Sequence, residues 1–70
     1  MNEAQREYVK TFYALYEYGR DVFDWTDDEF NGEILERAKS MRSSVDSFDD
    51  HRFTKQEWLE VLNDIISGCQ

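Results

Sequence analysis

The chain contains one helix-start pattern twice, as WTDDEF at residues 25–30 and as FTKQEW at residues 53–58. Each copy reads aromatic, Thr, two polar residues, Glu, aromatic. In such a pattern the Thr side chain accepts from the backbone N–H three residues on, and the Glu side chain accepts from the backbone N–H of the Thr. The two copies are therefore capping boxes, and they predict helices that begin just after Thr26 and Thr54.

The aromatic residues of each copy predict a hydrophobic staple, in which the residue before the cap packs on the fourth helical residue. We expect Trp25 to pack on Phe30, and Phe53 to pack on Trp58. Such contacts fix the angle at which the chain enters each helix.

Apolar residues recur at three- and four-residue steps in the first segment, which predicts a helix over residues 3–23, capped by Asn2 with Gln5. The stripe expected to face the core is Ala4, Tyr8, Phe12, Leu15, Tyr16, Gly19, Val22 and Phe23. Gly19 has two interpretations: close packing within the stripe, which we prefer, or a helix stop.

Two further apolar stripes complete the fold. The stripe Phe30, Ile34, Ala38, Met41, Val45 and Phe48 predicts a helix over residues 27–47, although the serines near its end compete for backbone hydrogen bonds. A wide apolar arc over residues 55–67 predicts the most buried helix, with Gly68 as its stop. Short connections make neighbouring helices antiparallel, so we expect one all-α domain over residues 1–70, a small antiparallel three-helix bundle.

Charge restricts the partners. The chain has 16 acidic and 8 basic residues, a net charge of −8, which disfavours direct binding to nucleic acid or to an anionic membrane and favours a basic protein surface. No apolar run reaches the ~18 residues of a membrane span, and residues 1–20 show no leader. With Cys69 as its single cysteine, the chain fits a reducing compartment, and we expect a soluble, cytoplasmic protein.

Most of the excess charge lies between residues 21 and 36, where no Lys or Arg occurs. The members of this acidic cluster are Asp21, Asp24, Asp27, Asp28, Glu29, Glu33 and Glu36. Asp27 and Asp28 are explained in part by the helix dipole, which favours anions in a first turn. The other carboxylates have two interpretations, a merely solvated face or a surface that imitates the charge of a nucleic acid backbone and docks on a Lys/Arg groove.

Amphipathic side chains outside the core stripes are candidate anchors for a partner. Tyr13, Tyr18 and Leu35 fall off the expected core faces, although packing at the edge of the core also explains them. Arg37, Lys39 and Arg42 follow the acidic cluster, so the second helix is polarised along its length. A second copy of the chain is therefore an alternative partner, and a self-associating helical adaptor is the alternative function.

We expect no catalytic residue, no cofactor and no metal site. His51 and Cys69 are the one histidine and the one cysteine, and the sequence has no nucleophile, zinc or phosphate-loop motif. Residues 46–57 resemble a degenerate EF-hand loop through Asp46, Asp50 and Glu57. Phe48 and His51 occupy positions where the family has an oxygen ligand and a glycine, so calcium binding is a minor alternative.

In size, acidity and lack of catalytic motifs the chain resembles the small acidic inhibitors that bacteriophages and mobile elements encode, such as anti-CRISPR proteins and other nucleic-acid mimics. The resemblance is one of composition. It implies a non-enzymatic inhibitor that docks the acidic cluster on the basic, nucleic-acid-binding surface of a larger host protein.

Overall fold

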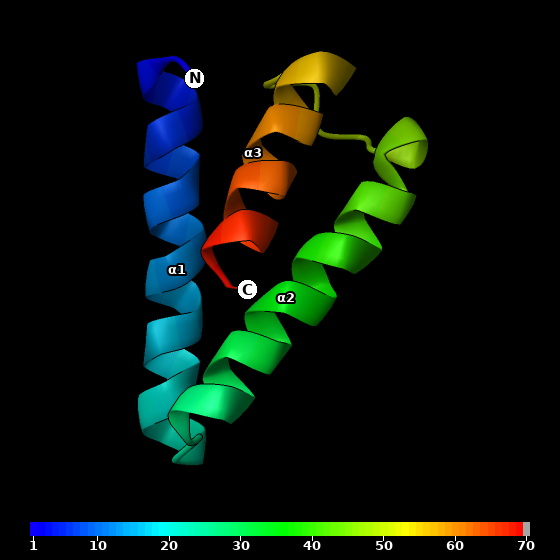
Figure 1. The fold of residues 1–70 in the computed structure, drawn as a ribbon. Helices are drawn as coiled ribbons and strands as arrows, with labels where there is room; N and C mark the ends of the chain where they lie inside the picture. The colour runs from blue at the N-terminus through cyan, green and yellow to red at the C-terminus, as the bar shows by residue number, and fades with distance from the viewer. Residues whose placement is uncertain (70) are drawn as a thin grey trace.

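The computed structural model describes residues 1–69, and within them the chain forms three α-helices, α1 (Glu3–Phe23), α2 (Asp27–Ser43) and α3 (Lys55–Gly68). A single 3₁₀ turn, η1 (Val45–Ser47), follows α2. Figure 1 shows α1 and α2 as the antiparallel arms of a V, with α3 between the arms and running in the same direction as α1. The expected all-α three-helix bundle is confirmed.

All three α-helices begin at a capping box, as predicted. The N-cap residues and their partners are Asn2 with Gln5, Thr26 with Glu29, and Thr54 with Glu57. In each box the N-cap side chain accepts from the backbone N–H of its partner, and the partner side chain accepts from the backbone N–H of the N-cap. Two backbone N–H groups at the start of each helix are therefore satisfied by side chains three residues away.

One of the two predicted staples is confirmed. The rings of Phe53 and Trp58 lie 4.9 Å apart at a near-perpendicular angle. The other predicted staple, between Trp25 and Phe30, is wrong. Among the described residues Trp25 stacks on Tyr16 and Phe23 of α1 instead of on Phe30. The chain reverses at Asp24 in a left-handed conformation, and the Trp25 ring folds back over Gly19, where an added Cβ would lie 3.5 Å from the ring. Close packing at Gly19 is thus observed.

The second helix ends four residues earlier than the predicted residue 47. At its end, serine hydroxyls donate hydrogen bonds to backbone carbonyls of the preceding turn. Ser43 Oγ donates to Lys39 O at 3.1 Å, and Ser44 Oγ donates to Ser40 O at 2.8 Å. The N–H of Ser44 turns to Met41 O at 3.1 Å. This tightening converts the last predicted turn into η1, which still buries Val45.

The core lies along α3, which contributes five buried residues, as expected for the most buried helix. They are Trp58, Val61, Leu62, Ile65 and Ile66. Phe12 of α1 and Ile34 and Ala38 of α2 pack against them. No helix in the described part of the chain is long and apolar enough to cross a membrane.

The predicted core stripe of α1 is only partly buried. Leu15, Val22 and Phe23 are 66%, 57% and 67% exposed, which contradicts their expected place in the core. The reason is the length of α3, which is about 21 Å against about 31 Å for α1. Gln5 Nε2 donates to Glu57 O at 3.0 Å near the start of α3, and Tyr13 Oη donates to Ile65 O at 3.4 Å near its end. Within residues 1–69, α3 therefore ends beside the middle of α1, and the rest of α1 extends past it (Figure 1).

Candidate functional site

The acidic cluster surrounds the junction of α1 and α2, at the vertex of the V in Figure 1. All seven carboxylate residues are exposed. Asp21 lies on the last turn of α1, Asp24 lies in the connection, and the other five follow α2 from its first residue. Two helices and a short connection thus present the cluster to solvent on a folded scaffold.

The chain's own cations neutralise little of this cluster. Within residues 1–69 the one ion pair that a member forms joins Arg20 to Asp27. Glu29 is occupied differently, since its Oε1 accepts from Thr26 N at 3.1 Å in the capping box. The remaining five carboxylates have neither an ion pair nor a capping-box contact among the described residues, so most of the charge of the cluster is available to an external cation.

Asp24 joins the two halves of the cluster. Its φ of 56° lies in the left-handed region, which Asp tolerates better than most residues because its short side chain bonds locally. Its backbone N–H donates to Arg20 O and closes α1. The same residue therefore ends one helix, turns the chain into the next and contributes a carboxylate to the surface.

The three candidate anchors differ in their surroundings. Tyr18 is 72% exposed and points away from the core. Tyr13 and Leu35 are half-buried and pack against the core cluster, and Tyr13 also contacts Ile65 and Cys69 of the α3 end. Of the three, Tyr18 alone offers most of its side chain to a partner.

Two members of the cluster line a shallow hollow of about 250 Å³ between α1 and α2. Glu33 and Glu36 share it with Tyr16 and Arg37. Burial raises the pKa of the Tyr16 hydroxyl, and the Glu33 charge adds to this rise while the Arg37 charge opposes it. A phenol, two carboxylates and one guanidinium thus meet at this point on the surface.

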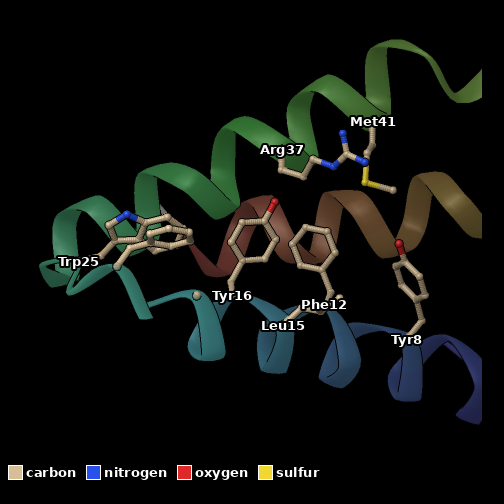
Figure 2. Close-up of a pocket in the computed structure, with 9 residues that line it drawn as sticks. Tyr8, Phe12, Leu15, Tyr16, Trp25, Arg37 and Met41 are labelled. Atoms are coloured by element: carbon tan, nitrogen blue, oxygen red, sulfur yellow. The ribbon is translucent and has the colours of Figure 1, made fainter. Parts of the chain in front are cut away.

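An apolar groove adjoins this hollow and was missed by sequence reasoning. It has a volume of about 400 Å³ and shares Tyr16 and Arg37 with the hollow. Figure 2 shows side chains of α1 and α2 facing each other across it. Periodicity gave no signal for it, because Leu15 and Phe23 have the same three- and four-residue spacing as the buried Phe12.

The loop that resembles an EF-hand does not gather its carboxylates. Asp46 Oδ1 binds Lys55 Nζ at 2.6 Å, and Glu57 accepts from Thr54 N at 3.0 Å and from Asn2 Nδ2 at 3.1 Å. In residues 1–69 no three His, Cys, Asp or Glu side chains are grouped so that they hold a metal ion. His51 is an exposed loop residue.

No protein-family model, curated protein or solved structure gives a significant match to this chain. Function is therefore inferred from the charge and shape of its own surface.

Proposed function

We propose that this protein is a non-enzymatic inhibitor that docks its acidic cluster on the basic, nucleic-acid-binding surface of a larger protein, in the manner of anti-CRISPR proteins and nucleic-acid mimics. One observation carries the proposal: the cluster is exposed on the α1–α2 pair, and within residues 1–69 only Asp27 is held in an ion pair. A surface of this kind attracts the lysines and arginines that otherwise hold phosphates.

The spacing of the carboxylates on α2 supports this role. Glu29, Glu33 and Glu36 follow one another at four- and three-residue steps, which places them about 6 Å and about 4.5 Å apart along the helix axis. Like charges at such steps cost a helix a few tenths of a kcal/mol per pair. Glu29 also serves the capping box, whereas Glu33 and Glu36 form no ion pair among the described residues, and a cation on a partner accounts for their presence.

Salt provides the first test of the proposal. We expect partners captured from a host lysate on the immobilised protein to elute as NaCl rises from about 0.1 M to about 1 M, because the screening length falls from about 10 Å to about 3 Å. Added double-stranded DNA should displace the same partners, since it competes for the same basic surface. Binding that ignores both salt and DNA would point to the alternative, a helical adaptor held by apolar packing.

A charge-removing variant provides the second arm of the test. The triple variant Glu29→Gln, Glu33→Gln and Glu36→Gln should lose at least about tenfold in affinity, because it deletes three charges from the docking face. A matched control makes the same change in net charge elsewhere, at Glu7, Glu17 and Glu60, which are exposed on α1 and α3. Equal loss in both triple variants would show that net charge alone, and not this face, drives binding.

A further inference from the structure

The groove between α1 and α2 is an apolar surface that the fold leaves open. Phe12, Tyr16, Trp25 and Met41 line it together with Leu15 and Phe23. In Figure 2, Phe12 and Tyr16 rise from α1 toward Arg37 and Met41 of α2, while α3 passes behind them. The groove therefore lies where a fourth helix would pack against the α1–α2 pair.

Two lining residues are exposed to a degree that indicates an absent neighbour. Leu15 and Phe23 leave 66% and 67% of their surface open, although each would gain by burial. Single exposed apolar residues are ordinary, but a contiguous group that borders a groove is typical of a binding site. The α1 helix is thus apolar on its side toward α3 and along this groove.

The charge around the groove selects the occupant. Glu33 and Glu36 line the hollow that shares Tyr16 and Arg37 with the groove, and the exposed carboxylate residue Asp24 lies between the lining residues Phe23 and Trp25 in the chain. A second copy is disfavoured, because two chains that each have a net charge of −8 repel each other. The carboxylates of both copies would also lie close together along the border of the groove. A helix with Lys or Arg beside its apolar face matches both the groove and its border.

We propose that this groove binds an amphipathic, basic helix of the partner protein, whose apolar side chains pack against Leu15, Tyr16 and Phe23 while its flanking lysines or arginines meet Glu33 and Glu36. The inference rests on the proposed function in taking the partner to be basic. It adds to that function a defined apolar contact and a secondary structure for the ligand.

The length of the groove sets the length of the ligand. From Tyr8 to Phe23, the first and last lining residues on α1, the groove extends about 22 Å, which corresponds to a helix of about 15 residues. The ligand then presents apolar residues at i, i+3 or i+4, and i+7. Arg37, the one cation among the lining residues, donates to a carbonyl or carboxylate of the bound helix.

The test uses a synthetic helical peptide of about 15 residues, with Leu on one face and Lys on the flanks. A second peptide of the same composition has its leucines spread around the helix, so it keeps the charge and lacks the apolar face. Emission from Trp25 reports binding, since Trp25 lines the groove, whereas Trp58 is already buried. We expect a blue shift and at least about tenfold tighter binding for the first peptide than for the second.

Three variants locate the contact. Leu15→Ser and Phe23→Ser should each weaken the first peptide about tenfold. The unfolding midpoint of Leu15→Ser should stay near that of the unchanged protein because Leu15 is 66% exposed, whereas Phe23→Ser should lower it because it also removes the ring that stacks on Trp25. Tyr18→Ser tests the candidate anchor outside the groove, because Tyr18 is 72% exposed on the same helix and is not among the residues that line the groove.

Each other outcome overturns the inference in its own way. If Leu15→Ser and Phe23→Ser bind the first peptide as the unchanged protein does, or if both peptides bind equally, the groove is not the binding site. The proposed docking of the acidic cluster is then unaffected. Loss in Tyr18→Ser alone places the ligand on the outer side of α1. Sedimentation of the unliganded protein as a dimer that Leu15→Ser dissociates assigns the groove to a second copy. If partner capture proves insensitive to salt and to added DNA while the peptide still binds, the proposed function is refuted and the inference about the groove stands.

Discussion

Tyr13 and Gly68 show how a single contact explains two residues at once. The Tyr13 hydroxyl donates to Ile65 O at 3.4 Å and lies 3.8 Å from Cys69 Sγ. A Cβ added at Gly68 would come within 2.9 Å of this hydroxyl. Helix α3 includes Gly68, one residue beyond the predicted end at residue 67, and Cys69 is its C-cap. No glycine in the described residues has a positive φ, so Gly68 is not the left-handed stop that the sequence predicted. Gly68 is therefore explained by the space that Tyr13 needs.

The same contact predicts how stability depends on alkaline pH. Burial, followed by the hydrogen bond with Cys69, raises the pKa of Tyr13 from 10.0 to about 12. A raised pKa means that the fold favours the neutral phenol, so the contribution is complete below pH 10 and is lost as pH rises toward 12. We expect the melting temperature to fall over this interval, and to fall less steeply in Tyr13→Phe.

Absorbance of the phenolate checks the assignment. The difference between the titrations of the unchanged protein and of Tyr13→Phe isolates the Tyr13 hydroxyl, since Tyr8 and Tyr16, whose pKa values are also raised by burial, are common to both. A difference curve centred at the ordinary value of 10.0 would contradict the partly buried contacts of the Tyr13 hydroxyl with Ile65 and Cys69.

Helix starts are determined at the scale of the element. The boxes at Asn2, Thr26 and Thr54 satisfy backbone donors that would otherwise lack partners in the first turn. The start of α3 matters most, because this helix carries five of the buried core residues. The backbone N–H of Thr54, the largest of several causes, lowers the pKa of Glu57, so this carboxylate remains ionised in its box under mildly acidic conditions.

Removal of the Thr54 cap should cost stability. Thr54→Ala deletes the acceptor for Glu57 N, and we expect the free energy of unfolding to fall by about 1 kcal/mol. Thr54→Ser retains the acceptor and should lose far less. Urea titrations of the three proteins measure the difference, and equal losses in the Ala and Ser variants would assign the effect to the methyl group of Thr54 instead of to its hydroxyl.

At the scale of the whole molecule, binding and stability make opposite demands on the acidic cluster. The chain has a net charge of −8, and the carboxylates of five members of the cluster take part in neither an ion pair nor a capping box in residues 1–69. Such a surface costs folding energy through self-repulsion. The molecule therefore combines a well-capped helical scaffold with a surface whose charge is not balanced internally.

This conflict predicts that the triple Gln variant of Glu29, Glu33 and Glu36 folds more stably than the unchanged protein. Relief of two like-charge pairs at helical spacing should raise the free energy of unfolding by about 0.5 kcal/mol, and Gln at position 29 still completes a capping box. Thermal melts at low salt measure the gain, which should shrink at high salt. A loss of stability would mean that these carboxylates serve the fold and would weaken the case for a partner.

The candidate site was only partly predictable from the sequence. All seven members of the acidic cluster are exposed, in keeping with a polar run that lies off the apolar stripes. The groove was not predicted, because Leu15, Val22 and Phe23 have the spacing of core residues and periodicity does not reveal whether a neighbour is present. The predicted Trp25 staple was wrong for a related reason, because the Trp25 ring stacks on Tyr16 and Phe23 of α1, and the local pattern does not reveal these alternative partners.

The sequence by itself determined where the helices begin, because a capping box is made by residues three positions apart and needs no distant contact. It also determined the helical class, through apolar repeats at three- and four-residue steps. Only the tertiary structure decided which side of α1 remains open. That outcome depends on α3 ending beside Tyr13, a contact between residues 52 positions apart, and on the angle at which α2 leaves the left-handed turn at Asp24.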